Sequence, residues 1–305
     1  MYSVRPVTPG SRRLDLLSVL AAAILWSSGG VFIKILFVRH DMTAPALTCW
    51  RSLFAAAALC WALPRLKNAP RLPILAASAC YGLVLLLFVA AMSRTSSANA
   101  IYLQYVYPLF VGAAAWALLG ERLDPRRGLG LALGAIGVGV IVVGPRQSGE
   151  LPAIFMALAS GILLAAFTLI CRFIRGQHAV GLTAFGNLFV AAALAPMAWG
   201  PAPPSPQALL LLAGLGAFQI ALPYVLFIRA LGRLPATTVS LLTLLEPVLN
   251  PLWTWMGLGE IPATPTFIGG AMLLAALIIE FTRPAPPKAS GRTSFQSPST
   301  HGRGS

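Results

Sequence analysis

Charged residues are scarce in this 305-residue chain: they make up 10% of it, and only 8 of them are acidic. An ordinary soluble domain has about a quarter charged residues, so this composition excludes a typical soluble globular protein. The sequence also lacks an HExxH pair, a glycine-rich phosphate loop and a serine nucleophile elbow, and its three histidines are scattered. The four cysteines show no metal-ligand spacing. The sequence therefore predicts no enzyme, no metal site and no cofactor.

Apolar residues are abundant instead, at 57% of the chain with a mean hydropathy of +0.79. A membrane-spanning helix needs roughly 20 mostly apolar residues. Ten such runs follow one another, at about Leu16–Phe37, Pro45–Leu63, Leu72–Met92, Ser97–Leu119, Arg127–Val143, Pro152–Phe173, Val180–Trp199, Gln207–Leu231, Pro235–Leu258 and Pro265–Phe281. No segment between them is long enough to fold alone. The sequence predicts an all-α membrane protein with ten transmembrane helices in a lipid bilayer.

The distribution of lysine and arginine predicts the orientation of these helices. If the N-terminus is cytoplasmic, the inside segments hold 17 basic residues and the outside loops hold 3, with Lys34 and Arg51 left inside apolar runs. This bias is typical of a membrane protein with both termini in the cytoplasm. We expect a cytoplasmic N-terminal segment at 1–15 and a disordered cytoplasmic tail at 283–305. The net charge of +14 is then a topology signal, and no basic soluble face exists to bind nucleic acid.

An internal repeat organises the chain. Residues Ala98–Glu121 align without a gap on residues Thr237–Glu260 at a shift of 139, which places Pro108 on Pro247. A proline inside a helix removes a backbone hydrogen bond and usually kinks the helix. The repeat predicts two five-helix units, at 16–143 and 152–282. Because five is odd, the units have opposite topology, which favours a substrate site at their interface and alternating access.

These residues resemble a known family. Tyr107-Pro108 with Gly120-Glu121, and Glu246-Pro247 with Gly259-Glu260, are similar to the repeats of EamA-like transporters in the drug/metabolite transporter superfamily, and Trp26 and Arg51 also fit. The resemblance implies a secondary transporter of a small metabolite, such as an amino acid, an amine or a drug-like molecule. Tyr107 stands where the second repeat has Glu246, so the two halves need not perform the same chemistry.

Several functions remain compatible with this resemblance. We expect an exporter in the bacterial inner membrane, and the alternative is an uptake permease for a small carboxylate or another metabolite. A channel is less favoured, because the chain shows an inverted repeat and no filter-like loop. A membrane-embedded enzyme is also less favoured, because the sequence shows no cluster of histidines or acidic residues at one membrane face. The glycine pair Gly130 and Gly134 favours close packing within the chain, with a homodimer as the second interpretation.

Three ionisable residues lie within the predicted spans, namely Lys34, Arg51 and Glu246. Such groups are costly in a membrane and are functional candidates by default. Glu246 could bind a proton or a substrate amine, or it could pair with Arg51 or Lys34 for structure alone. Arg51 could bind a substrate carboxylate or partner a buried acid. Lys34 could instead extend to the membrane interface.

Uncharged polar and aromatic residues complete the predicted site. Thr243, Glu246 and Asn250 recur at helical spacing, and Gln104 and Tyr107 form the matching stripe in the first half. We expect the two stripes to face one water-accessible space. The candidate substrate-binding residues are Trp26, Lys34, Arg51, Tyr81, Gln104, Tyr107, Thr243, Glu246 and Asn250, with helix kinks at Pro108 and Pro247. Proton coupling through Glu246 is expected, whereas Glu121 and Glu260, at helix ends, are interpreted as structural.

Overall fold

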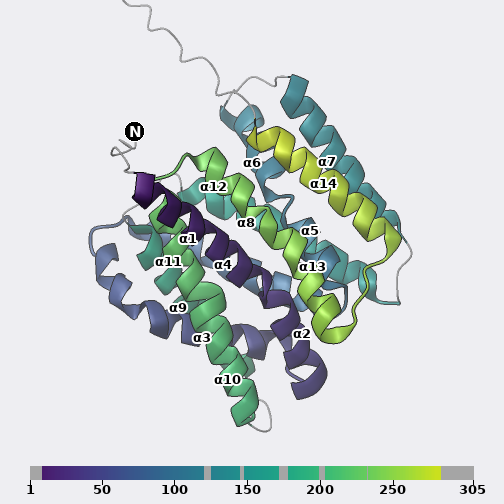
Figure 1. Ribbon diagram of the computed structural model, residues 1–305. Coiled ribbons are helices and arrows are strands. Elements are labelled where there is room, and N and C mark those ends of the chain that lie inside the picture. The colour runs from purple at the N-terminus through teal and green to yellow at the C-terminus, as the bar shows by residue number, and fades with distance from the viewer. Residues whose placement is uncertain are drawn as a thin grey trace, which may run out of the picture.

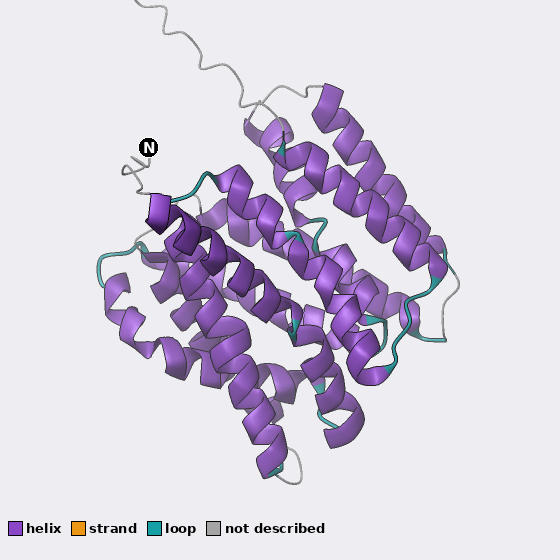
Figure 2. Cartoon of the chain, in the orientation of Figure 1, coloured by secondary structure: helices purple, strands orange, loops and turns teal. Residues whose placement is uncertain are grey.

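The computed structural model describes residues 9–119, 125–144, 148–171, 178–198, 203–231 and 233–282. Within these ranges the chain is helical and no residue belongs to a strand (Figure 2). The all-helical fold class expected from the sequence is therefore confirmed. Residues 1–8 of the predicted N-terminal segment, Glu121 and the predicted tail lie outside the described residues.

The helices fall into two halves in chain order. The described part of the first half consists of α1 (Pro9–Ser27), α2 (Gly29–His40), α3 (Ala44–Leu59), the 3-10 helix η1 (Cys60–Leu66), α4 (Arg71–Met92), α5 (Ser97–Gln104), α6 (Tyr107–Leu119) and α7 (Pro125–Val143). The described part of the second half consists of α8 (Glu150–Cys171), α9 (Ala179–Ala198), α10 (Pro206–Gly214), the π-helix η3 (Leu215–Ala221), α11 (Leu222–Leu231), α12 (Ala236–Thr243), α13 (Leu245–Leu258) and α14 (Thr264–Phe281).

Capping residues fix several helix ends. Thr43, Ser96 and Ser205 precede α3, α5 and α10, and each side-chain oxygen accepts a backbone N–H from the first turn of its helix. These N-caps satisfy amide groups that have no partner within the helix. At the end of α13, Gly259 adopts a left-handed backbone with φ of 67°, which ends the helix and places Glu260 directly after it.

Eight helical segments in the described part of the chain are long and apolar enough to cross a bilayer. They are Arg12–His40, Ala44–Leu66, Arg71–Met92, Pro125–Val143, Glu150–Cys171, Ala179–Ala198, Pro206–Leu231 and Thr264–Phe281. The other two predicted spans correspond to α5 with α6 and to α12 with α13, and each of these is interrupted before it reaches that length. The membrane fold is thus supported by eight segments, and the count of ten crossings stays a prediction.

The two interrupted spans break at matching positions of the repeat. The first break lies at Tyr105 and Val106, and the second lies at Leu244, which is the repeat equivalent of Tyr105. Each break stands three residues before a proline, Pro108 or Pro247. Because proline has no N–H, the carbonyl four residues earlier loses its usual donor. The chain therefore bends at the same depth in both halves.

Equivalent helices of the two halves pack against each other. α3 packs against α9, and α7 packs against α14 (Figure 1). The other contacts occur in exchanged pairs: α4 packs on α8 as α11 packs on α1, α5 packs on α8 as α12 packs on α1, and α6 packs on α8 as α13 packs on α1. This exchange is the pattern of a pseudo-two-fold arrangement, and it places the broken helices α5 and α13 in contact between the halves.

The packing between α7 and α14 depends on small residues. A Cβ atom built on Gly137 would lie 2.8 Å from the carbonyl oxygen of Gly269, and one built on Gly269 would lie 2.5 Å from that of Gly137. Only glycine permits this backbone approach at both positions. Gly130 and Gly134 of α7 also face Ala276 of α14. Gly130, Gly134 and Gly137 are thus used for packing within the chain.

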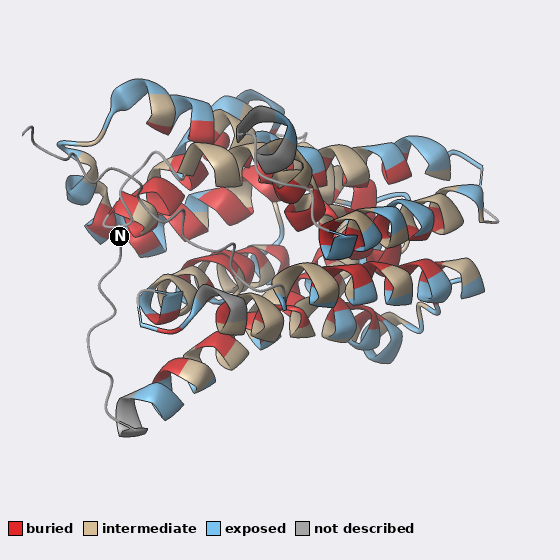
Figure 3. Ribbon diagram, turned by 90° about the horizontal axis from the view of Figure 1, so that it is seen from above, coloured by how far each residue is buried: buried red, intermediate tan, exposed pale blue. Residues whose placement is uncertain are grey.

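Large apolar side chains cover much of the outer surface. Val143 is 81% exposed, Leu210 is 74% exposed and Met256 is 65% exposed. Buried residues concentrate on the inward sides of the helices (Figure 3). Contiguous apolar surface of this kind marks contact with lipid or another apolar partner, and it is the surface expected of an integral membrane protein.

Candidate functional site

Glu246 lies at the break between α12 and α13, in the first turn of α13. The hydroxyl of Tyr105, at the break between α5 and α6, donates a hydrogen bond of 2.6 Å to Glu246 Oε2. The same hydroxyl lies 3.2 Å from the backbone oxygen of Thr243, which is the carbonyl that Pro247 leaves without an amide donor. Tyr105 therefore joins the two broken helices and the two halves at one point.

Three further phenol groups extend this centre. The ring of Tyr107 lies 6.1 Å from the ring of Tyr105, and both phenols interact electrostatically with Glu246. Tyr224 of α11 also interacts electrostatically with Glu246, and its ring packs edge-on against Tyr81 of α4. Glu246 is partly buried, and Tyr105 is the one hydrogen-bond donor to it among the described residues. Its Oε1 atom is therefore available to a proton or a substrate group.

An aromatic cluster lies next to Tyr224. The ring of Trp26 in α1 packs edge-on against Tyr224 at 5.2 Å and against Phe227 at 5.3 Å. Tyr81 packs against Tyr224 at 6.2 Å and against Phe167 of α8 at 5.5 Å. The predicted residues Trp26 and Tyr81 thus come together through Tyr224. Rings of this kind offer apolar contact area with polar edges.

Arg51 of α3 lies beside this cluster. Its side chain is 2% exposed, and its guanidinium interacts electrostatically with Tyr81 and Tyr224. Asn187 of α9 is fully buried, and its Nδ2 donates to the Tyr81 hydroxyl at 3.2 Å and to the Thr183 carbonyl at 2.8 Å. Asn187 therefore fixes the position of the Tyr81 hydroxyl.

The remaining residues of the two predicted polar stripes contact different parts of the protein. Gln104 Nε2 donates to Ser160 Oγ of α8 at 3.3 Å. The Thr243 hydroxyl donates to the Ser240 carbonyl within its own helix at 2.8 Å, so its backbone oxygen, not its side chain, contacts Tyr105. Of the expected polar stripes, Tyr107 reaches the Glu246 centre through its ring contact with Tyr105, and Gln104 connects to α8.

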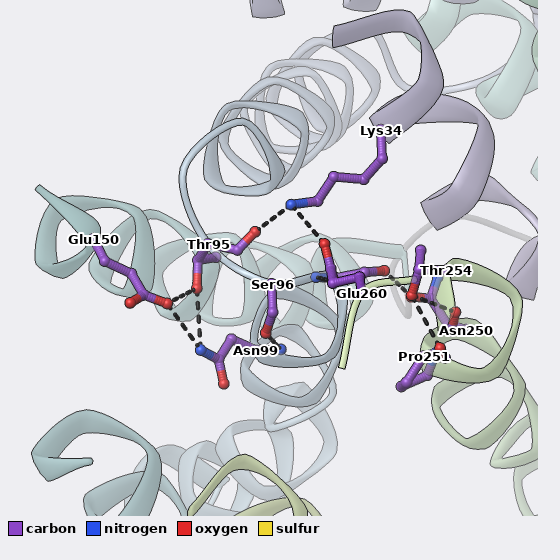
Figure 4. Close-up of polar contacts among 10 residues, drawn as sticks. Lys34, Thr95, Ser96, Asn99, Glu150, Asn250, Pro251, Thr254 and Glu260 are labelled. Carbon is purple, nitrogen blue, oxygen red and sulfur yellow. Dashed lines mark hydrogen bonds and ion pairs between the residues drawn. The ribbon is translucent and has the colours of Figure 1, made fainter. Parts of the chain in front are cut away.

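Lys34 lies in a second polar layer near one end of the helices (Figure 4). Its ammonium group is 3.0 Å from Glu260 Oε2 and donates to the Thr95 carbonyl at 2.7 Å. Glu260 Oε1 accepts a hydrogen bond of 2.6 Å from the backbone N–H of Ser97. At a rise of 1.5 Å per residue, Glu260 lies about 20 Å along the chain from Glu246. The structure therefore places Lys34 with Glu260 and separates it from the Glu246 centre.

This Lys34–Glu260 network extends across the same end of the molecule. Thr95 Oγ1 donates to Glu150 at 2.6 Å, and Asn99 Nδ2 lies 3.1 Å from Thr95 Oγ1 and 3.2 Å from the same carboxylate. Thr266 of α14 donates to Asn99 Oδ1 at 2.8 Å. The network thus connects α2, the turn before α5, the start of α8, the end of α13 and α14.

Asn250 belongs to the inner edge of this network. It is 2% exposed, its Oδ1 accepts a hydrogen bond from Ser97 Oγ, and its Nδ2 donates to the Ser27 carbonyl at 3.2 Å. Ser27 in turn accepts a hydrogen bond of 2.9 Å from the Trp253 indole. Asn250 therefore ties α13 to α1 and to α5, which differs from the exposed cavity position that its spacing predicts.

The sequence analysis did not select Tyr105, Tyr224 or Asn187. Tyr105 could have been selected from the sequence, because it lies at the break before Pro108. Its hydroxyl can donate a hydrogen bond to a backbone carbonyl that a proline leaves without an amide donor. Asn187 is a fully buried amide inside an apolar helix, but a search for charged residues overlooks it. Among the described residues no three His, Cys, Asp or Glu side chains lie together as metal ligands.

Two broken helices that meet at a carboxylate, and two halves that exchange equivalent contacts, are the features of a membrane transporter. More particularly, the chain belongs to the EamA-like transporter family, which matches residues 14–143 and 151–282. The two matched segments correspond to the two repeats. The family assignment expected from the sequence is confirmed, and it indicates a transporter, which is not an enzyme.

Similar proteins are named as transporters. An uncharacterized transporter of Archaeoglobus fulgidus is 30% identical over 63% of this chain and 70% of its own length. The pseudopaline exporter CntI of Pseudomonas aeruginosa is 28% identical over 64% of this chain and 70% of its own. The uncharacterized inner membrane transporter YicL of Salmonella typhimurium is 26% identical over 88% of this chain and 96% of its own.

One solved crystal structure has a similar fold. It superposes with a TM-score of 0.62 at 18% identity and covers 88% of this chain and 96% of that chain. At this identity the match shows the fold alone, and it covers both halves.

Proposed function

We propose that this protein is a secondary transporter that exports a small metabolite by alternating access between its two halves. The class of metabolite includes amino acids, amines and drug-like molecules. The similarity to a named exporter supports the outward direction, and the similarity to a named inner membrane transporter supports that location. An uptake permease is the alternative, because alternating access can run in either direction and the driving gradient decides.

The contact between Tyr105 and Glu246 is the observation on which the proposal depends. The carboxylate lies where both interrupted helices bend, and a hydroxyl from the opposite half holds one of its oxygens. Discontinuous helices at a repeat interface are where transporters bind substrates and coupling ions. Glu246 binds a proton or a cationic substrate group on its remaining oxygen, and movement of α13 against α5 exposes it to one side or the other.

In this proposal, the Lys34–Glu260 network closes one face of the protein. It joins α2, the turn before α5 and the end of α13 at the face that holds the loops around 41–43 and 259–263. The basic-residue bias predicts that this face is external. The described state then has its external side closed by an ion pair and hydrogen bonds, and opening requires that the pair separates.

Transport by reconstituted protein tests the proposal. Wild-type and Glu246→Gln protein are placed in proteoliposomes, and accumulation and exchange of radiolabelled metabolites are measured with and without a proton gradient. Glutamine keeps the shape and removes the charge. We expect gradient-driven accumulation to fall to background in Glu246→Gln while exchange persists.

Asp41→Asn is the matched control, because Asp41 is an exposed carboxylate at a helix end. It is expected to transport like the wild type. Accumulation by Glu246→Gln that equals the wild type at every pH would contradict the coupling role of Glu246.

A further inference from the structure

A cluster of basic residues lies where α3 and α4 are joined. Arg65 stands near the end of η1, Lys67 follows η1, and Arg71 begins α4; all three are exposed. None of the eight acidic residues of the chain lies between positions 42 and 120. The ion pairs among the described residues do not include any of these three side chains. In the part of the chain that the structure describes, the three positive charges therefore have no acidic counterion.

Arg65 is held in a defined position at this surface. Its guanidinium carbon lies 4.6 Å from the centre of the Trp61 ring, which is a cation–π contact. The Trp61 indole in turn donates a hydrogen bond of 3.1 Å to the Ala58 carbonyl, so the end of α3 orients the ring. Both Trp61 and Arg65 are exposed. The cation is thus placed by the protein and remains accessible to a ligand.

The backbone beneath this cluster is anchored to the start of α9. His178 Nδ1 lies 2.6 Å from the Arg65 carbonyl oxygen. A Cβ atom built on Gly181 would lie 2.8 Å from the Ala62 carbonyl oxygen, so η1 packs directly against α9. Ala62 is fully buried in an apolar cluster with Val180. An anchored backbone lowers the ordering cost that a ligand would otherwise have to offset when it binds.

The cluster lies between apolar and polar surface. The segments Ala44–Leu66 and Arg71–Met92 are each long enough to cross a bilayer, and one ends where the other begins. Leu72 is 77% exposed and Trp61 is 51% exposed, and tryptophan collects at the level of the lipid headgroups. The matching connection of the second repeat, at 199–205, contains no lysine or arginine. The repeat fold therefore does not require these charges, and their setting suits a ligand with an anionic head and apolar tails.

We propose that Trp61, Arg65, Lys67 and Arg71 form a binding site for an anionic phospholipid of the surrounding membrane. The lipid phosphate accepts hydrogen bonds from the two guanidinium groups, and the lysine adds a point charge. The acyl chains lie along the exposed apolar surface of Trp61 and Leu72. Basic segments directly beside a spanning helix attract anionic lipids in this way. The inference is independent of the transported substrate and of the direction of transport.

Native mass spectrometry of the full-length protein in detergent tests this site, because it resolves individual bound lipids. The protein is titrated with phosphatidylglycerol, with phosphatidylcholine and with inorganic phosphate. Three basic residues near a membrane surface give an anionic lipid an advantage on the order of a hundredfold, and we expect the wild type to prefer phosphatidylglycerol over phosphatidylcholine by at least tenfold. The triple variant Arg65→Gln, Lys67→Gln and Arg71→Gln should lose this preference. Trp61→Leu keeps an apolar side chain but removes the ring beneath Arg65, and it should weaken phosphatidylglycerol binding by about threefold.

The matched control is the triple variant Arg12→Gln, Arg13→Gln and Arg229→Gln. It removes the same charge from three exposed positions on the same predicted side of the membrane, and it should keep the wild-type preference. Both triple variants should unfold at the wild-type midpoint, because all six side chains are exposed.

Three outcomes would overturn the proposal. A wild type that binds both phospholipids equally would have no site for an anionic headgroup. An equal loss of preference in the two triple variants would indicate a general attraction by the net charge. Inorganic phosphate that binds as tightly as phosphatidylglycerol would indicate a site for a free anion rather than for a lipid.

Discussion

The ion pair between Lys34 and Glu260 should set how easily one face of the protein opens. The two side chains are 15% and 21% exposed, and their charged atoms are 3.0 Å apart. Exposed pairs contribute about 0–1 kcal/mol, and breaking a buried pair costs about 3–5 kcal/mol. For this intermediate burial we expect a coupling energy of about 2 kcal/mol between Lys34 and Glu260, obtained from unfolding of Lys34→Gln, Glu260→Gln and the double variant.

The same energy should appear in the conformational equilibrium. If the pair exists only in the closed state, its loss shifts the population toward the open state by about thirtyfold. Ser27 is a suitable reporter, since it is fully buried and lies about 10 Å deeper than Lys34 along the same span. In a background without the four native cysteines, Ser27→Cys should react with an externally added, membrane-impermeant maleimide more than tenfold faster in Lys34→Gln.

Two controls make this prediction specific. Lys67→Gln removes an exposed lysine and should leave the labelling rate unchanged. The exchanged variant Lys34→Glu with Glu260→Lys restores opposite charges at the two positions and should recover part of the closed population. Recovery stays incomplete because a lysine at position 260 cannot accept the Ser97 N–H. A coupling energy near zero together with an unchanged labelling rate in Lys34→Gln would refute the reasoning.

Three further predictions concern other parts of the molecule. Tyr105→Phe removes the hydroxyl that contacts both Glu246 and the Thr243 carbonyl. We expect the unfolding free energy to fall by about 1–3 kcal/mol and transport to be at least tenfold slower. Unchanged values of both would refute the role of Tyr105. Gly269→Leu should destabilise the protein by roughly 1–3 kcal/mol because its side chain meets the opposing backbone, whereas Gly139→Leu, with no atom near its Cβ position, should unfold like the wild type. A phosphatase fused to the C-terminus should show no periplasmic activity, since the basic-residue bias predicts a cytoplasmic C-terminus. High periplasmic activity would contradict the predicted orientation.

The sequence predicts the fold of this protein well because its signals are local. Long apolar runs define the spans, and two prolines at equal depth predict where the chain bends. The breaks before Pro108 and Pro247 lie where a helix loses a donor, and this depends on neighbouring residues alone. The family assignment follows from the same residues.

The partners of the candidate site residues depend on how the halves pack, which sequence spacing does not determine. The donor to the Glu246 carboxylate is Tyr105, whose ring packs against Tyr107, and spacing alone does not select it. Asn250 lies on the same helix as Glu246, yet it is engaged by Ser97 and Ser27. Lys34 pairs with Glu260 because both residues lie at one end of the molecule. No sequence pattern within either helix indicates that pairing.

The contact of Tyr105 with the Thr243 carbonyl has an evolutionary consequence. The hydroxyl from one half compensates for a hydrogen bond that Pro247 removes in the other half. A lineage that replaced this proline would regain the amide donor, and the tyrosine would then retain only its contact with the carboxylate. Substitutions at positions 105 and 247 should therefore be correlated among related transporters, although the two residues lie in different gene repeats. After duplication, the two copies would no longer be free to diverge independently at these positions.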